Sequence, residues 1–316
     1  MQKLANTTTL THEEWLELRK KGIGGSDIGK ILGLSNWGSP LSVFVDKTTP
    51  VQESDEENLA MELGLELEPF LRRKFERWVA KEEGIEVCIR RNNFVLADDK
   101  FSYMIADIDG DFVHPTHGRT GVELKTVSEM GHVNWKDDEI PDQYYAQVQW
   151  YLMVTGYKIW YLVYLVGNRK LGVKIIERND EFIENMRGQA VDFWNNFILT
   201  NTAPSPIGKD VDHDAILALW PTETAGEQIE YTDPEVQKQL AEVMDGYDKA
   251  NEMKHHIDAI IKEGKQYIEF LMKDAETMLF NGRKFTFKTT NRKAYTVEAK
   301  SYRSLLIGKV KNEVAS

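Results

Sequence analysis

Hydrophobic residues recur at three- and four-residue steps in several segments, and this spacing predicts helices. Two of these helices are marked by residues that start or stop helical structure. Pro69 is expected in the first turn of a helix that runs to about Ala80, and a helix that opens at Pro141 is closed by Gly156. Further helices are predicted over residues 11–21, from an N-cap at Ser26 or Asp27 to about residue 32, and over 180–199. The segment 36–40 breaks the helical pattern after the second of these.

Continuous or alternating apolar runs predict the strands. The longest run, Ile159–Val166, is far too short to span a bilayer and is interpreted as a buried strand. Because helices alternate with the strands, the predicted fold class is α/β, with a central mixed β-sheet flanked by helices on both faces. Strands are predicted over residues 87–96, 101–108, 122–127, 158–166 and 171–177.

The chain is predicted to divide after about residue 203. Residues 1–203 hold the predicted sheet and its helices and form the first domain. Residues 204–232, which include Pro204 and Pro206, are interpreted as a linker. Residues 233–316 form a C-terminal appendage of helix and β-hairpin.

The appendage has two recognisable patterns. Apolar residues from Val236 to Leu271 follow heptad spacing, which Lys254 and Gly264 interrupt. One or two helices packed on the body and an intermolecular coiled coil both fit this spacing. Residues 280–283, Phe-Asn-Gly-Arg, then predict a two-residue hairpin turn, because Asn-Gly accepts the positive φ angles that such a turn requires.

Candidate chemistry lies on the predicted strand 122–127 and in the turn before it. Side chains alternate faces along a strand, so Glu123 and Lys125 should share one face while Leu124 packs on the other. Asp109 precedes Gly110 at a predicted turn, which can bring its carboxylate beside Glu123. Two carboxylates suit Mg²⁺, and a lysine can orient or activate a water beside the metal. This layout is that of a metal-dependent nuclease.

The Glu-x-Lys triplet alone is weak evidence, because the chain contains four of them, starting at Glu123, Glu252, Glu263 and Glu298. Two lie in the helical heptad pattern, where residues two apart diverge. The last has no aspartate between it and Asp274. Only Glu123 combines a strand with an upstream Asp-Gly turn, and an ordinary charged surface strand stays an alternative.

A basic, glycine-rich loop precedes the second helix, from Arg19 to Asp27. Ser26 or Asp27 is the expected N-cap, and the free N–H groups of a helix start favour an anion. Glycines let a backbone approach a phosphate closely. A simple capped loop is the alternative interpretation.

The net charge of −12 at first argues against DNA binding, because phosphate contacts need cations. The charge is unevenly distributed: Gly282–Lys311 contains nine Lys or Arg residues and one Glu, a balance of +8 that leaves the remainder near −20. A basic end on an acidic body indicates a surface for nucleic acid or an acidic partner, although a solvated basic hairpin explains it too. Residues 53–57 are expected to form an acidic, mobile loop.

Cysteine and hydropathy predict an intracellular, cytoplasmic protein without a membrane segment. The single cysteine, Cys88, excludes an internal disulfide, and in its strand-like run it is expected to pack rather than react. The N-terminal residues lack the apolar core of a signal peptide. The scattered histidines form no zinc-like set with the cysteine.

Five segments occur in a particular order and spacing: Arg19…Gly-Ile-Gly-Gly-Ser26-Asp, Gly64-x-x-x-Glu68-Pro, Asp109-Gly110, Glu123-Leu-Lys125 and Tyr144-x-Ala-Gln147-Val-Gln-Trp-Tyr. In that order and spacing they resemble the YqaJ-type viral recombinase family, relatives of lambda exonuclease within the PD-(D/E)XK nuclease superfamily, over residues 15–200. One departure is an Ile-Asp-Gly sequence in place of Pro-Asp-Gly, which leaves every implied ligand present.

The resemblance implies a metal centre. Asp109 and Glu123, helped by the backbone carbonyl of Leu124, would ligate Mg²⁺. Two Mg²⁺ ions are implied, and Mn²⁺ can substitute for them. Lys125 and Gln147 would position and polarise the attacking water. Glu68 would support the metal shell, directly or through water.

The resemblance also implies contacts with DNA. Arg19 and Ser26 would hold a terminal 5′-phosphate, the arginine through a bidentate fork. Met61 is hypothesised to be a wedge that parts the terminal base pair, although a plain core or loop methionine fits this residue too.

The family implies a processive exonuclease that degrades one strand of linear duplex DNA from its 5′ end and leaves a 3′ single strand for phage or prophage recombination in a bacterial host. A homotrimer and a single-strand annealing protein as partner are further implications. Two alternatives stay open at this point: a PD-(D/E)XK endonuclease for restriction or junction resolution, and a noncatalytic DNA-end or recombination scaffold protein.

Overall fold

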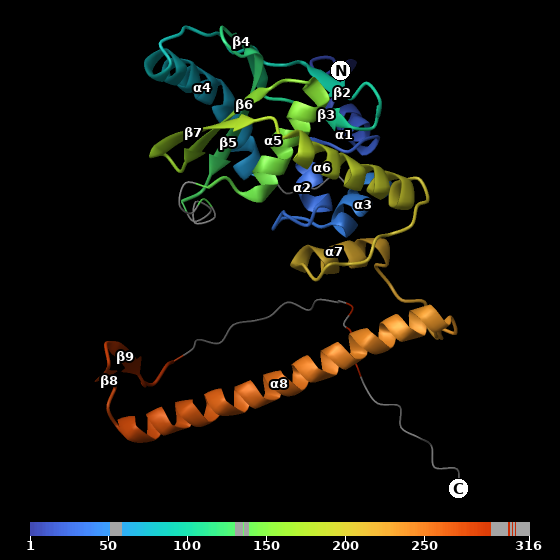
Figure 1. Cartoon of the computed structure of the whole chain (residues 1–316). Coiled ribbons are helices and arrows are strands. Elements are labelled where there is room, and N and C mark those ends of the chain that lie inside the picture. Colours follow the sequence, from blue (N-terminus) through green and yellow to red (C-terminus); the bar gives the residue numbers. More distant parts are fainter. Residues whose placement is uncertain are drawn as a thin grey trace. The chain divides into compact units, whose positions relative to one another are not determined.

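The computed structural model describes residues 1–50, 59–129, 135, 139–291, 303, 305 and 307, and the expected acidic loop at 53–57 lies outside them. The chain divides into two compact units, Met1–Pro221 and Thr222–Ser316 (Figure 1). No helix within the described ranges is both long and apolar enough to cross a membrane.

A mixed four-stranded sheet carries the first unit. Its order is β4 (Gly110–His114), β5 (Gly118–Val127), β6 (Ile159–Val166) and β7 (Lys170–Glu177) (Figure 1). β5 pairs antiparallel with β4 and parallel with β6, and β6 pairs antiparallel with β7. The predicted mixed sheet is therefore confirmed.

Helices cover both faces of this sheet, as predicted. On one face α4 (Leu59–Glu82) packs its buried residues against β5 and β6. On the other face lie α5 (Asp142–Thr155), α2 (Gly25–Ile31) and α6 (Asp180–Phe193). The strand β6 is apolar throughout because its side chains are buried on both faces of the sheet. Tyr161 and Val163 pack in the cluster on the α4 side, and Trp160, Leu162 and Tyr164 pack in the cluster on the α5 side.

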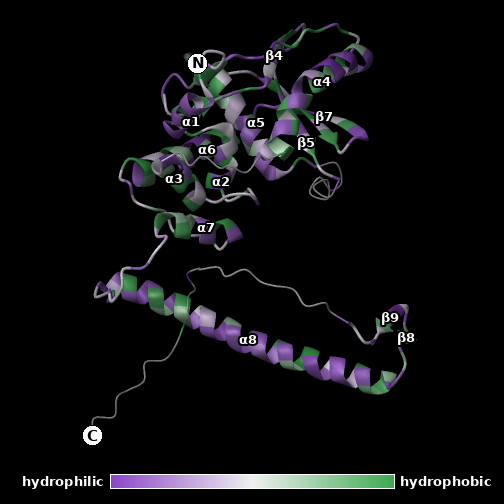
Figure 2. Cartoon of the chain, turned by 180° about the vertical axis from the view of Figure 1, so that it is seen from behind, coloured by the Kyte–Doolittle hydropathy of each residue, from purple (hydrophilic) through white to green (hydrophobic). Residues whose placement is uncertain are grey.

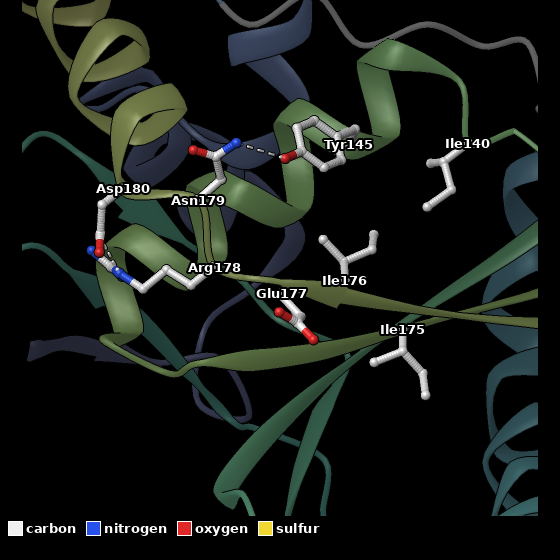
Figure 3. A pocket seen from close by; sticks show the side chains of 8 residues that line it. All are labelled: Ile140, Tyr145, Ile175, Ile176, Glu177, Arg178, Asn179 and Asp180. Atoms are coloured by element: carbon white, nitrogen blue, oxygen red, sulfur yellow. Dashed lines mark hydrogen bonds and ion pairs between the residues drawn. The ribbon is translucent and has the colours of Figure 1, made fainter.

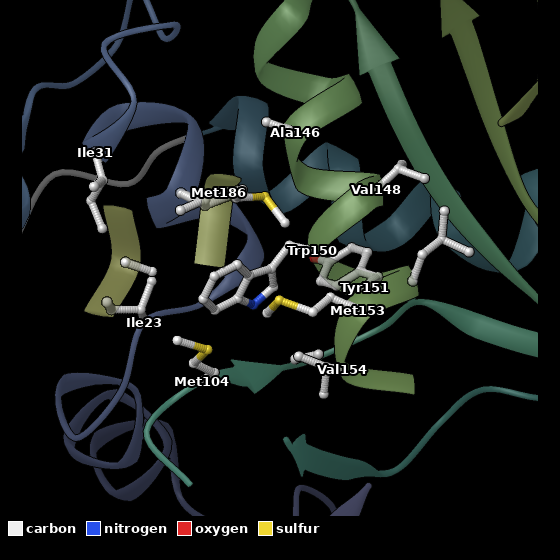
Figure 4. Close-up of a cluster of buried hydrophobic side chains, with 14 of the residues drawn as sticks. Ile23, Ile31, Met104, Ala146, Val148, Trp150, Tyr151, Met153, Val154 and Met186 are labelled. Carbon is white, nitrogen blue, oxygen red and sulfur yellow. The ribbon is translucent and has the colours of Figure 1, made fainter. Parts of the chain in front are cut away.

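The α5 layer forms the larger core. Trp150 of α5 is fully buried, and its ring nitrogen donates to the carbonyl oxygen of Ile105 at 2.7 Å (Figure 4). Ile105 belongs to a second sheet, which consists of β1 (Gln2–Asn6), β2 (Phe94–Ala97) and β3 (Ile105–Ala106). Gly156 ends α5 in the left-handed region with φ of 74°, which confirms the predicted helix stop.

Two further helices of the first unit, α1 (His12–Lys20) and α3 (Pro40–Thr48), have nine residues each. α1 is capped by Thr11, and α3 is capped by Ser39, where the predicted break ends. α6 continues into a π-helical turn, Trp194–Ile198, so the predicted helix 180–199 is confirmed apart from the change in its last turn.

The structure corrects two predictions about helices. Pro69 lies inside α4 and not in its first turn. The turns before Pro69 expose Leu59, Met61 and Leu65, so they carry no pattern of buried positions that would predict a helix. The N-cap of α2 is Gly24, not Ser26 or Asp27, and the Asp27 carboxylate reaches back to the Gly24 N–H at 2.9 Å.

The predicted linker is also wrong in part. Residues 204–232 include α7 (Asp210–Leu219), which packs on α3. Asp212 accepts hydrogen bonds from the N–H groups of Ile207 and Lys209, both at 2.9 Å, and Lys209 Nζ donates to the carbonyl of Gly33 at 2.8 Å. The first compact unit therefore extends beyond residue 203, to Pro221.

Two strand predictions and one side-chain prediction were inaccurate. The strands expected at 87–96 and 101–108 shrink to β2 and β3, and β1 and β4 were not predicted. Cys88, expected to pack in a strand, is exposed in irregular chain. These segments pair over only a few residues, so their alternation is too short to locate them.

The described part of the second unit contains α8 (Pro234–Met272) and a hairpin of β8 (Thr277–Phe280) and β9 (Arg283–Thr286). The 39-residue helix α8 is a single element in which hydrophobic residues alternate with polar ones (Figure 2). Asn281 and Gly282 have positive φ angles of 47° and 72° at the hairpin turn, which confirms the predicted two-residue connection.

Candidate active site

The register of β4 on β5 brings Asp109 to Glu123. Gly110 pairs with Val122, so the residue before β4 lies beside the next residue of β5. The Leu124 N–H donates to Asp109 Oδ2 at 2.8 Å. Because the N–H and C=O of one strand residue point to the same edge, the Leu124 carbonyl faces the edge where Asp109 lies.

The alternation of β5 separates polar from apolar side chains. Leu124 packs in the α4 cluster, on the face predicted for it. Glu123 and Lys125 lie on the opposite face, where Gln147 of α5 meets Glu123: Gln147 Nε2 donates to Glu123 Oε1 at 2.9 Å. Lys125 Nζ lies 2.6 Å from the same oxygen.

The second oxygen of Glu123 is the unusual feature of this cluster. Glu123 is only 2% exposed, and its Oε2 has no hydrogen-bond partner within the described part of the chain. Burial, and next the charge of Asp109, raise the pKa of Glu123 to about 8, against the opposing effect of Lys125. Burial raises the pKa of Asp109 as well. A cation between two buried carboxyls that oppose each other's ionisation would stabilise the charged form of both.

The donor set fits a hard divalent cation. No group of three or more His, Cys, Asp or Glu side chains in the described ranges is arranged to hold a metal. Asp109 and Glu123 supply two carboxylates, and the Leu124 carbonyl points to the same edge. Mg²⁺ is commonly bound through one or two carboxylates and keeps several waters, so two acidic side chains are sufficient for it.

Lys125 and Gln147 are held in place by aromatic rings. Lys125 Nζ lies 5.4 Å from the ring centroid of Tyr144. Gln147 Nε2 also contacts the Tyr151 hydroxyl at 2.9 Å. Tyr151 stands in the matched motif, one helical turn after Gln147 on α5, but the sequence analysis assigned it no role.

Glu68 lies close to this cluster on the α4 side. Burial, and after it the charge of Asp109, raise the pKa of Glu68. Its Oε2 is paired with Arg72 Nη2 at 2.8 Å, one helical turn along α4. A direct role of Glu68 at a metal stays a prediction, and its pairing with Arg72 fits an outer position.

The structure brings Arg19 and Ser26 together. Arg19 Nη2 donates to Ser26 Oγ at 2.8 Å, and the guanidinium lies 5.0 Å from the ring centroid of Trp15. The Trp15 ring nitrogen in turn donates to Asp107 Oδ2 at 3.0 Å. Arg19 is thus a cation held by a hydroxyl and an aromatic face, and the sequence interpretation had not included Trp15.

Gly25 connects this arginine site to the carboxylates. A Cβ at Gly25 would lie 2.5 Å from Cε1 of Tyr151, so only glycine lets the loop pack this closely on that ring. Tyr151 contacts Gln147, which contacts Glu123. The two predicted subsites are therefore neighbours joined through one tyrosine.

A groove of about 630 Å³ lies beside the lysine, with Trp37, Thr126 and Tyr144 among its walls. Ala60 of α4 also lines it, and the adjacent Met61 is 67% exposed, a position compatible with contact to a ligand. A separate hollow of about 480 Å³, where β7 meets α6, is lined by Tyr145 and Asn179 (Figure 3). None of the predicted site residues lines either cavity, but Thr126 and Tyr144 place the larger groove next to Lys125.

An acidic pair and a lysine, two of them on the inner strand β5 of a mixed sheet and one directly before β4, are backed by a glutamine from the next helix, and together they form the arrangement of a PD-(D/E)XK nuclease core. A family model described as YqaJ-like viral recombinase domain matches residues 14–158. A relative described as uncharacterized protein YqaJ, from Bacillus subtilis (strain 168), is 31% identical over 275 residues, covering 86% of this chain and 82% of the relative. The chain belongs to the YqaJ-like viral recombinase family.

Solved structures offer more distant likenesses. An alkaline exonuclease, LHK-Exo from Laribacter hongkongensis, is 20% identical with a TM-score of 0.46, over 58% of this chain and 91% of that one. A phage-related exonuclease from Haemophilus somnus 129PT is 14% identical with a TM-score of 0.39, over 57% of this chain and 96% of that one.

Proposed function

We propose that this chain is a Mg²⁺-dependent exonuclease that digests one strand of linear double-stranded DNA from its 5′ end and leaves a 3′ single strand for recombination. The observation that carries the proposal is the buried, unpartnered Oε2 of Glu123 beside Asp109, with Lys125 and Gln147 at the other oxygen. Membership of a viral recombinase family supports a role on DNA.

The chain's own residues would perform distinct tasks. Asp109, Glu123 and the Leu124 carbonyl would hold Mg²⁺, and Mn²⁺, another hard cation, would substitute. When bound, Mg²⁺ polarises a phosphodiester and lowers the pKa of water. Gln147 orients the Glu123 carboxylate through its amide and leaves an amide oxygen able to accept from water. Lys125 would orient and activate the attacking water beside the metal.

The arginine site supports the proposed direction of digestion. Arg19 and Ser26 present a guanidinium and a hydroxyl, the donors that suit a terminal phosphate. They lie one tyrosine away from the carboxylates, so a 5′-phosphate held there places a bond near the strand's end at the acidic pair. Glu68 would support the metal shell through water, and exposed Met61 would part the terminal base pair.

Assembly belongs to the proposal as well. A homotrimeric ring would keep an acidic protein on DNA over many turnovers with few phosphate contacts. The second unit, with its apolar residues along α8, is available to recruit a single-strand annealing protein. Recruitment would bring that protein to the 3′ strand as the strand is exposed.

A comparison of two substrates tests the proposed function. A linear duplex and a covalently closed circle are each incubated with enzyme and Mg²⁺, and in parallel with EDTA. We expect digestion of the linear duplex alone, abolished by EDTA. Digestion of both would indicate an endonuclease, and digestion of neither a noncatalytic scaffold protein. Lys125→Ala should be inactive, and Lys170→Ala, an exposed lysine on β7, is the matched control.

A further inference from the structure

A buried lysine lies beneath the arginine site, and the proposed function does not yet include it. The side chain of Lys47, on α3, is only 4% exposed. Its Nζ donates to Asp27 Oδ2 at 2.7 Å and to the backbone carbonyl of Arg19 at 2.9 Å. One ammonium group thus joins the end of α1 to the start of α2.

Asp27 is the group that this ammonium neutralises. The same Oδ2 accepts from the Gly24 N–H at 2.9 Å, which fixes the glycine loop. The other oxygen, Oδ1, lies 3.9 Å from Arg19 Nη2. Burial alone would raise the pKa of Asp27, but the charges of Lys47 and Arg19 outweigh burial and lower it. The carboxylate therefore stays charged within reach of the guanidinium.

Two cations compete for this one carboxylate. Lys47 makes the shorter contact, at 2.7 Å, while Arg19 remains at 3.9 Å and directs a hydrogen bond to Ser26 Oγ instead. Without Lys47, a buried carboxylate would lack its closest countercharge, and the nearest remaining cation is Arg19. The guanidinium would then close on Asp27, and fewer of its donors would face a ligand.

We infer that Lys47 is a positioning residue for terminal-phosphate recognition: by neutralising Asp27 and holding the Arg19 backbone, it keeps the guanidinium available to a 5′-phosphate. This inference rests on the proposed function. It makes Lys47 a determinant of the preference for phosphorylated ends, without contact with the substrate.

The neighbouring Lys20 provides a matched control. It is also a partly buried lysine that joins α1 to the end of α3, where Nζ donates to the Thr49 carbonyl at 2.6 Å. Its ion pair is with Glu17 at 3.6 Å. Removal of Lys20 disturbs the same helix packing while leaving Asp27 with Lys47.

The experiment measures initial rates on 5′-phosphorylated and 5′-hydroxyl linear duplexes that are otherwise identical. The full chain should prefer the phosphorylated substrate. Lys47→Met should lower this preference about tenfold, which is the effect expected when one charge-assisted hydrogen bond to the phosphate is lost. The rate at saturating 5′-hydroxyl duplex should stay unchanged. Lys47→Arg should restore most of the preference, and Lys20→Met should keep it.

A neutral double variant separates guanidinium capture from poor folding. Asp27→Asn/Lys47→Met removes both buried charges and leaves an amide to accept from Gly24, so the preference should return toward that of the parent even if Lys47→Met is unstable. An unchanged preference in folded Lys47→Met, an equal loss in Lys20→Met, or a loss in the double variant that matches the single one overturns the inference. An inactive parent, or one with equal rates on both ends, instead overturns the proposed function or its phosphate site.

Discussion

Gly25→Ala adds one methyl group where the glycine loop meets Tyr151, and its effect follows from the geometry. The new Cβ would lie 2.5 Å from Cε1 and 2.8 Å from Cζ of the ring, whereas ordinary contacts begin at 3.4 Å. The ring must retreat by about 0.9 Å to relieve the first contact. Tyr151 is buried, so the retreat displaces its packed neighbours or its hydroxyl.

A retreat of this size is enough to break the contact with Gln147. The hydroxyl lies 2.9 Å from Gln147 Nε2, and at about 3.6 Å the hydrogen bond no longer exists. Gln147 then loses one of the two groups that orient it against Glu123. Misplacement of a catalytic group by about 1 Å can reduce a rate roughly 100-fold. The extra methyl group in a packed core should also cost about 1–3 kcal/mol of stability.

The assay combines the rate on 5′-phosphorylated linear duplex with urea unfolding. We expect Gly25→Ala to lose about 100-fold in kcat. This loss is much larger than the one that the fraction of unfolded protein would cause. Gly188→Ala is the control, because Gly188 lies in α6 with nothing within 4 Å of its added Cβ, and alanine there should stabilise the helix by up to about 1 kcal/mol. Parental activity in Gly25→Ala would refute the coupling of the loop to Gln147 through Tyr151.

Four further outcomes are expected. Lys125→Ala should lose cleavage by several orders of magnitude yet still shift linear duplex in a gel, since the phosphate grip is intact; near-normal cleavage contradicts the assignment. Asp27 has a lowered pKa, so its contribution to stability is present at a pH above the ordinary carboxyl pKa of about 3.9 and is lost as the pH falls through the pKa of the folded state. The difference in unfolding free energy between the parent and Asp27→Asn should therefore shrink only on acidification, and a difference that is constant with pH argues against the ion pair. A chain truncated after Pro221, the end of the first unit, should still digest linear duplex and should no longer bind the annealing partner in a pull-down. Its digestion should be slower at high salt if basic residues beyond Pro221 touch phosphates, and an inactive truncated chain would show that the second unit belongs to the core fold. Light scattering should give about three times the 36.4 kDa chain mass, and a strict monomer with and without DNA rules out the ring.

Local patterns were sufficient to predict the parts of the fold that depend on neighbouring residues in sequence. The alternation of β5 placed Glu123 and Lys125 on one face and Leu124 on the other, and the structure has them there. Gly156 stopped α5, and Asn281-Gly282 formed the hairpin turn, because each of these positions needs a positive φ angle.

Features that depend on distant contacts could not be predicted in this way. The sequence analysis gave Lys47 no role, since only the packing of α3 on α1 and α2 buries its side chain against Asp27. Trp15 likewise gains Asp107 from another segment, and Tyr151 meets Gly25 of α2, although its bond to Gln147 lies within α5. Pro69 was misplaced because a proline most often marks the first turn, whereas the preceding turns of α4 expose their apolar residues.

The polarity of digestion tests the central claim most directly. A linear duplex is labelled at its 5′ ends in one reaction and at its 3′ ends in another, and label released as mononucleotide is measured in the presence of Mg²⁺. Release of the 5′ label should begin without delay, while the 3′ label should stay on long strands until digestion is nearly complete. Early loss of the 3′ label, or retention of both labels on intact duplex, would contradict a 5′-end exonuclease.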